Sequence, residues 1–388
     1  TTHTSPARAL SAGPGSEVIL GLPSLTDVTV EVVAEHNGVT SRSAMQSATT
    51  GALPDDLPQP TLGTWLEGDT ASEDYVLGSF DADAGEAYSG PYWLFILDRM
   101  GRIVWYHPVE EGRMSMFPRL ARDGSHIAYD NRNDFFGELE GNPSTVRRMT
   151  LDGTWSTDVL TPGMGWTWDE LPDSTVLYDR NQATPDVTIQ EVAPDGTQTT
   201  LWDCGAWMAE YDDDKENCYT NTVNYSPQTD SIWWSTYWGD YIVEVDRSGE
   251  VLRHIGARPD SWTIEPAEAG IELQHYPNFT PTGTLILSTH IPGDETEQQR
   301  AWEYEIDDEA KTFTAVWGYG EGEDAWAEYS GEAVRLEGGS TLINYGTGGE
   351  IREVSLAGEL LWQVSWGEDY TLGHTQLIGD LYALNVGG

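Results

Sequence analysis

Short runs of alternating apolar and polar residues recur along most of this chain, with turn residues between them. The stretch 275–317 shows the unit: two runs flank a turn at Gly283, and two more flank a turn that begins at Asp307. Alternation with period two, broken by Gly, Asp, Pro and Ser, is typical of antiparallel strands joined by tight turns. Four such strands form a meander the size of one propeller blade.

Both halves of this unit recur at a spacing of about fifty residues, within the range of known blade repeats. The inner half recurs around 120–128, 171–177, 225–233, 279–287, 336–343 and 377–384. The outer half recurs around 98–105, 152–155, 194–202, 246–252, 304–317 and 356–362.

The series begins with an outer half that has no inner half before it, and it ends with an inner half that has no outer half after it. Together these two pieces complete one blade from both ends of the chain, which closes the ring and protects its sheet edges. We therefore predict an all-β fold, a six-bladed β-propeller over 75–388, closed by the segments 75–105 and 374–384.

The first fifty residues also alternate, but they do not fit the blade unit. The stretch 21–30, Gly-Leu-Pro-Ser-Leu-Thr-Asp-Val-Thr-Val, looks like the C-terminal part of a fibronectin type III or immunoglobulin-like sandwich. Residues 1–50 are too few for the seven strands of that fold, so we predict a partial β-sandwich. Its missing part is truncated, replaced by packing on the propeller, or supplied by self-association with a strand of another subunit. Residues 51–74 are predicted to be a Pro-rich linker.

The net charge of the chain excludes some classes of binding partner. The formal net charge is -46, with only 19 Lys and Arg against 65 Asp and Glu. A surface of this sign repels nucleic acid, so no nucleic-acid partner is predicted. The 17 Trp and 18 Tyr favour a packed protein over a disordered one. A folded surface covered in carboxylates is expected of a salt-adapted (halophilic) or exported marine protein. The chain has no apolar run long enough to predict a membrane span.

The two cysteines, Cys204 and Cys218, close a short loop. This arrangement favours a disulfide in an exported protein, with free thiols as the alternative. A metal site on these cysteines lacks further ligands at a useful spacing, so no metal is predicted. The acidic run 212–216 is interpreted as a solvated charged segment rather than a calcium loop.

Several blades in order resemble the bacterial arylsulfotransferase family, through the segments 218–232, 242–256, 274–287, 300–307 and 344–354. The resemblance covers roughly 75–388. It implies an exported propeller, extracellular or periplasmic, that moves a sulfuryl group from an aryl sulfate to a phenol. It further implies a sulfated histidine intermediate, no nucleotide cofactor, and a small aromatic or sulfated ligand in the central channel.

Such a transfer needs a neutral imidazole nucleophile, donors for the sulfate oxygens, and an acid or base for the phenol. In a propeller these groups are expected where the innermost strands enter the channel. The six predicted entries are 116–117, 166–168, 219–221, 275, 329–330 and 374. Only two entries carry histidine, so His275 and His374 are the predicted nucleophiles, and Arg300 is a candidate to hold the sulfate.

Four more residues are candidates for binding the substrate: Tyr219, Asn221, Trp168 and His290. Tyr219 stands where the resemblance leads us to expect histidine, and a phenol cannot replace a sulfated imidazole. Trp168 either stacks on a ring of the substrate or fills the channel. Two functions therefore remain open: an arylsulfotransferase-like enzyme, and a non-catalytic extracellular propeller that binds a ligand or partner or has a structural role.

Overall fold

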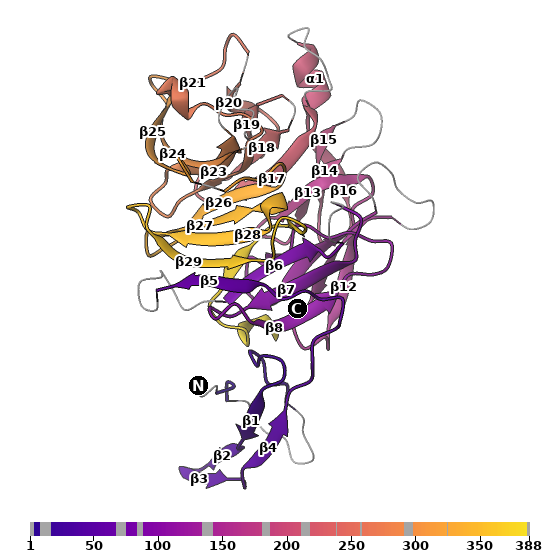
Figure 1. The fold of residues 1–388 in the computed structure, drawn as a ribbon. Coiled ribbons are helices and arrows are strands. Elements are labelled where there is room, and N and C mark those ends of the chain that lie inside the picture. Colours follow the sequence, from indigo (N-terminus) through magenta and orange to yellow (C-terminus); the bar gives the residue numbers. More distant parts are fainter. Residues whose placement is uncertain are drawn as a thin grey trace.

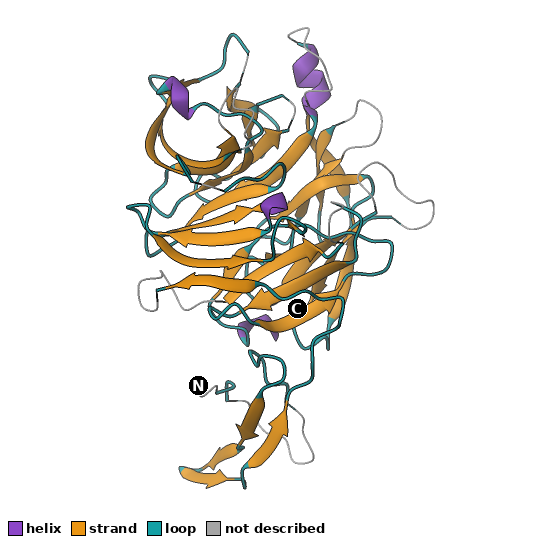
Figure 2. Ribbon diagram, in the orientation of Figure 1, coloured by secondary structure: helices purple, strands orange, loops and turns teal. Residues whose placement is uncertain are grey.

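The computed structural model describes residues 4–7, 17–66, 75–83, 88–133, 143–180, 187–210, 218–237, 239–256, 258–290, 298–323 and 325–385. Six sheets, antiparallel except for one outer strand pair, follow one another around a ring, which confirms the predicted β-propeller (Figure 1). Strands make up nearly all of its regular structure, with a few short helices in the connections (Figure 2). No helix in these described ranges is long and apolar enough to cross a membrane.

The first three blades are four-stranded meanders whose innermost strand comes first in the sequence. The first blade comprises β9 (Arg119–Leu120), β10 (Ile127–Asn131), β11 (Thr145–Met149) and β12 (Ser156–Leu160). The second comprises β13 (Met164–Glu170), β14 (Val176–Arg180), β15 (Thr188–Val192) and β16 (Gln198–Asp203). The third comprises β17 (Thr220–Ser226), β18 (Ser231–Thr236), β19 (Ile242–Asp246) and β20 (Val251–Ile255).

The fourth and fifth blades each carry a fifth, outer strand. The fourth comprises β22 (His275–Phe279), β23 (Leu285–His290), β24 (Gln299–Asp307) and β25 (Thr312–Tyr319), with β21 (Thr263–Glu265) parallel to β25. The fifth comprises β26 (Gly331–Arg335), β27 (Thr341–Tyr345), β28 (Glu350–Val354) and β29 (Leu360–Ser365). Short 3-10 helices lie at η2 (Ala267–Ala269), η3 (Gly346–Gly348) and η4 (Ala383–Asn385).

The sixth blade is built from both ends of the chain, as the order of the repeats predicts. The strands β6 (Tyr75–Asp81), β7 (Tyr92–Leu97) and β8 (Ile103–Pro108) come from the front. The C-terminal strands β30 (Thr371–Leu372) and β31 (Gln376–Ile378) pair with β6 on its inner side.

The segment between the N-terminal residues and the ring contributes a further strand, β5 (Thr61–Trp65), within the range predicted to be a linker. β5 pairs antiparallel with β29 and forms the outer edge of the fifth blade. In sequence order, β5 therefore precedes the strands of the sixth blade. Its pairing with β29 covers an edge of the fifth blade that would otherwise present unpaired backbone groups.

The N-terminal strands form a hairpin that projects from the ring (Figure 1). β1 (Asp27–Val30) pairs with β4 (Gln46–Thr49), and β2 (Val33–His36) pairs with β3 (Val39–Arg42). Most side chains of these four strands are exposed. The fibronectin-like or immunoglobulin-like assignment stays a prediction.

Neighbouring blades are joined by a repeated contact that involves the tryptophan of the outer strand. The indole Nε1 of Trp317 donates to the Leu356 carbonyl in the outer turn of the next blade, at 2.9 Å. Trp362 makes the equivalent bond to the Arg99 carbonyl at 2.8 Å. Each indole therefore packs against the adjacent blade and also donates a hydrogen bond to one of its carbonyl groups. Tryptophan at an apolar interface usually finds such a partner for its N–H.

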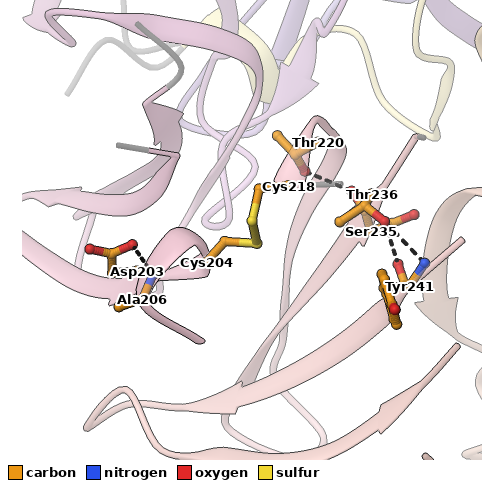
Figure 3. Close-up of a disulfide and its surroundings, with 8 residues drawn as sticks. All are labelled: Asp203, Cys204, Ala206, Cys218, Thr220, Ser235, Thr236 and Tyr241. Carbon is orange, nitrogen blue, oxygen red and sulfur yellow. Dashed lines mark hydrogen bonds between the residues drawn. A yellow bond between two sulfur atoms is a disulfide. The ribbon is translucent and has the colours of Figure 1, made fainter. Parts of the chain in front are cut away.

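The predicted disulfide is present between Cys204 and Cys218. Cys204 begins α1 (Cys204–Ala209), whose first turn is capped by the Asp203 carboxylate accepting from the Ala206 backbone N–H (Figure 3). Both cysteines are fully buried, and they pack in the core shared by the second and third blades. The bond therefore fixes the connection between these blades.

Removing this bond should lower the free energy of unfolding by about 3 kcal/mol, because it closes a loop of roughly fifteen residues. We expect this loss in the double variant Cys204→Ser and Cys218→Ser, measured by denaturant unfolding at fixed salt. Dithiothreitol should destabilise the wild type to a similar extent and leave the double variant unchanged. Equal stability of variant and wild type would contradict this expectation.

Candidate functional site

A small cavity lies where the inner strands of the six blades begin. Its volume is about 20 Å³, which is room for about one water molecule. Each blade contributes to its wall, in order: Met116 and Phe117; Trp166; Asn221 and Thr222; His275 and Tyr276; Ser330, Gly331 and Glu332; Gly373 and His374. All six predicted channel entries therefore meet at one place.

Irregular pairing at the start of the inner strands determines which side chains reach this cavity. The register of the inner strand against its neighbour shifts between Met164 and Trp168, between Thr220 and Thr222, and between His275 and Asn278. Such bulges interrupt the simple alternation of a strand and redirect side chains. They occur in the second, third and fourth blades.

His275 is held as a neutral imidazole with a defined tautomer. Its Nδ1 lies 2.8 Å from the Leu273 carbonyl oxygen, which can only accept, so Nδ1 carries the proton. Nε2 is therefore the lone-pair nitrogen, and its neighbour is the Ser330 backbone N–H at 3.4 Å. Burial, followed by the nearby His290, lowers the pKa of His275 to about 3.

The backbone around His275 is unusual as well. Leu273 has φ of 48° and Tyr276 has φ of 52°, so non-glycine residues in the left-handed region lie on both sides of the histidine. Ser330, across the cavity, has φ of 65°. Strained conformations of this kind cost roughly 1–3 kcal/mol each and cluster at functional sites.

His374 is paired with a buried carboxylate. Its Nδ1 lies 2.6 Å from Oε2 of Glu332, and both side chains are at most 5% exposed. The other oxygen, Oε1, accepts from the backbone N–H and the hydroxyl of Thr375, each at 2.5 Å, and from Asn344 Nδ2 at 3.1 Å. Burial raises the pKa of Glu332, but the positive charge that His374 carries when protonated and the hydrogen bonds to Glu332 hold this pKa below its usual value.

The ring of His374 is clamped between two aromatic side chains. It stacks on Phe117 with a centroid separation of 6.2 Å, and its centroid lies 4.7 Å from that of Tyr276. The neighbouring Gly373 permits this approach, because a Cβ there would lie 2.2 Å from Ser79 Oγ and 2.3 Å from the Met116 carbonyl oxygen.

A buried arginine lies next to the cavity in the channel. Arg119 donates to the Tyr276 hydroxyl at 3.2 Å and to Asn224 Oδ1 at 3.0 Å. Its guanidinium lies over the rings of Trp168 and Tyr276, and its Nη1 is 3.7 Å from an Asp169 carboxylate oxygen. Arg119 is therefore connected to the cavity wall through its hydrogen bond to Tyr276.

Aromatic rings surround the cavity. Tyr88, in the connection between β6 and β7, makes a 3.1 Å hydrogen bond with Ser330 Oγ and meets Trp166 edge-on at 5.4 Å. Tyr329 lies between Tyr88 and Tyr237, at 6.3 and 5.8 Å, and Tyr237 contacts the His275 ring at 5.9 Å. We call Tyr88, Trp166, Tyr237 and Tyr329 the aromatic collar.

The predicted site residues differ in how they relate to the cavity. His275, His374 and Asn221 line it, and Asn221 Oδ1 is buried with no hydrogen-bond partner among the described residues. His290, at the end of β23, lies behind His275, and burial lowers its pKa.

The other three candidates do not line the cavity. Trp168 donates from Nε1 to the Phe117 carbonyl at 2.9 Å and so supports a lining residue. The Tyr219 carbonyl accepts from the Tyr237 backbone N–H at 2.6 Å. Arg300 lies on β24, the third strand of its blade, where it pairs with Thr289 of β23, whereas the cavity lies at the start of the inner strands. Its role on the sulfate stays a prediction.

Sequence reasoning missed Glu332, Tyr276 and Arg119. Each lies one or two residues after a predicted entry: after 330, 275 and 117, respectively. Extending each entry by two positions would have found all three. Alternation along a strand accounts for Glu332 and Arg119, whereas Tyr276 is adjacent to His275 in the irregular pairing between His275 and Asn278.

No group of three or more metal-ligating side chains occurs within the described part of the chain. The acidic run 212–216 lies outside the described residues.

Comparisons with known proteins identify one family and several similar structures. A family model described as "Arylsulfotransferase (ASST)" matches residues 88–360, which is more than half of the chain. No curated protein sequence matches the chain. A solved structure of a protein of unknown function from Bacteroides caccae is similar, with a TM-score of 0.54 and 14% identity, covering 80% of this chain and 100% of the other. A periplasmic gluconolactonase from Pseudomonas aeruginosa has a TM-score of 0.49 and 11% identity, covering 90% and 94%.

Proposed function

The chain belongs to the arylsulfotransferase family, and from this premise we propose that its cavity transfers a sulfuryl group from an aryl sulfate to a phenol through a sulfated histidine. The observation that carries the proposal is His275: a buried, neutral imidazole whose Nδ1 is engaged by a carbonyl and whose Nε2 carries the lone pair. A neutral imidazole is the form that can act as a nucleophile.

In the first half-reaction, Nε2 of His275 forms a bond to sulfur while the bond between sulfur and the aryl oxygen breaks. The aryl oxide leaves with the electron pair. Nδ1 keeps its proton and continues to donate it in a hydrogen bond to the Leu273 carbonyl oxygen. In the second half-reaction, a phenol oxygen attacks the sulfur, the nitrogen–sulfur bond breaks, and the phenol proton passes to a base. The imidazole is regenerated, so one sulfuryl group moves and no cofactor is consumed.

Substrate entry requires movement of the aromatic collar. The cavity of about 20 Å³ is smaller than an aryl sulfate. Tyr88 is joined to the fifth blade by its hydrogen bond to Ser330, and breaking this bond would open a path beside His275. The displaced rings could then stack on the aryl group, since aromatic pairs favour offset and edge-on contacts.

Export is proposed as part of the same function. The buried disulfide supports an oxidising compartment, because such bonds persist in secreted and periplasmic proteins and are rare in the cytosol.

The proposal is tested by incubating the protein with 4-nitrophenyl sulfate, with and without phenol, at low and high salt. The salt series matters because a chain of net charge -46 repels an anionic donor less when its field is screened. We expect acceptor-dependent release of 4-nitrophenolate and a sulfated histidine detected by mass spectrometry. A folded protein without turnover at any salt would contradict the proposal and favour the non-catalytic alternative.

The pH dependence of the donor half-reaction gives a second test. Because the pKa of His275 is lowered to about 3, its imidazole stays neutral well below the ordinary histidine pKa of about 6.5. Single-turnover release of 4-nitrophenolate, quenched in alkali and read by absorbance, should therefore stay level from pH 7.5 to about 5. Half-maximal release near pH 6.5 would show that the nucleophile has an ordinary pKa.

A further inference from the structure

The pair formed by Glu332 and His374 is not used by the nucleophilic step. The carboxylate lies on β26 in the fifth blade, whereas the imidazole comes from the C-terminal segment that closes the sixth. The two meet at 2.6 Å between Glu332 Oε2 and His374 Nδ1, and both line the cavity that holds His275.

The two oxygens of Glu332 have separate partners. Oε1 accepts from Thr375 and Asn344, which anchors the C-terminal segment to the fifth blade. Oε2 faces His374. An ionised carboxylate can only accept hydrogen bonds, so the facing Nδ1 must carry a proton. In the neutral imidazole, Nε2 is then the lone-pair nitrogen.

We infer that Glu332 is a positioning residue that fixes this tautomer of His374, so that Nε2 takes the proton of the acceptor phenol in the second half-reaction. This inference rests on the proposed function. The phenol oxygen forms the bond to sulfur as its proton moves to Nε2, and the bond between sulfur and His275 breaks. Glu332 stays ionised and pairs with the imidazolium. The proton is then transferred from His374 Nε2 to the next departing aryl oxide or to water.

The variant Glu332→Gln separates this role from a structural one. The glutamine carbonyl can still accept from Thr375, but its amide would present N–H to His374 Nδ1 and move the imidazole proton to Nε2. His374 would then be unable to accept a proton from the phenol. Because 4-nitrophenolate leaves without a proton, the donor half-reaction should remain near the wild-type rate.

The expected result for Glu332→Gln is a loss of about 10²-fold in the acceptor half-reaction. The loss should be larger with phenol than with a more acidic phenol, which depends less on a base. The matched control is Glu353→Gln, a buried glutamate of the same blade whose partners are Ser340 and Arg99, away from the cavity. This control is expected to change stability without changing the ratio of the two half-reaction rates.

A readout that does not depend on activity accompanies the kinetics. Nitrogen-15 NMR of labelled histidine should show His374 protonated on Nδ1 in the wild type and on Nε2 in Glu332→Gln. An unchanged tautomer, or equal losses in both half-reactions, would overturn the inference. A wild type without any turnover would instead contradict the proposed function, while the NMR signals would still decide whether Glu332 sets the tautomer.

Discussion

Replacing His275 by alanine is expected to lower the turnover of 4-nitrophenyl sulfate by at least about 10³-fold, because the variant lacks the atom that receives the sulfuryl group. No intermediate can form, so the loss should appear in single-turnover release as well as in steady state. The sulfated peptide that contains residue 275 should be absent from the mass spectrum. Turnover and histidine sulfation are the two quantities to measure.

Two comparisons make this experiment decisive. Glu305→Ala changes an exposed charged residue on β24 of the same blade that does not line the cavity, and it should leave turnover near the wild-type value. His374→Ala should still release 4-nitrophenolate in a first turnover, because only the acceptor step needs His374, as the base that takes the phenol proton. A sulfated His374 in the His275→Ala variant would show instead that the two histidines have the opposite roles.

Replacing Glu303 by alanine should lower the free energy of unfolding by about 3–5 kcal/mol, because a buried guanidinium would lose its counter-charge. Arg335 of the fifth blade donates to Glu303 of the fourth at 2.6 Å, and the two side chains are 6% and 9% exposed. The guanidinium also lies 4.2 Å above the Trp317 ring. The pair therefore ties two blades together where water is excluded. Urea unfolding at fixed salt measures the loss.

The control for this variant is Glu191→Ala. Glu191 pairs with Arg247 across the second and third blades, but these side chains are 18% and 35% exposed, so the pair should contribute less than about 1 kcal/mol. Both variants remove one carboxylate from a highly acidic chain and relieve the same general repulsion. A loss in Glu303→Ala no greater than in Glu191→Ala would show that the buried pair adds nothing to stability.

The architecture could be predicted from sequence because its signal is repetitive. The spacing of turn residues predicted six blades, and the unpaired halves at the two ends predicted the closure that β6, β30 and β31 make. β5 could not be found this way, because a lone strand that directly follows a Pro-rich stretch has no partner in its own sequence neighbourhood. Its partner, β29, lies far along the chain.

The location of the cavity was predictable for the same reason, but the orientation of individual side chains was not. Trp168 and Tyr219 both lie within predicted entries. They do not line the cavity, because bulges in β13 and β17 change which residues reach it. Bulges depend on the three-dimensional path of a strand and leave little trace in its alternation. The pairing of Glu332 with His374 could not be predicted either, because the two residues belong to different blades.

The construction of the sixth blade sets the order in which the protein can be completed during synthesis. β6 is among the first ring strands to leave the ribosome, but Tyr75 pairs with Ile378, roughly 300 residues further along the chain. Blades one to five can therefore form while the first strands of the ring still lack their inner neighbours. Because His374 lies between β30 and β31, the cavity is complete only after this late segment has been synthesised and has paired with β6.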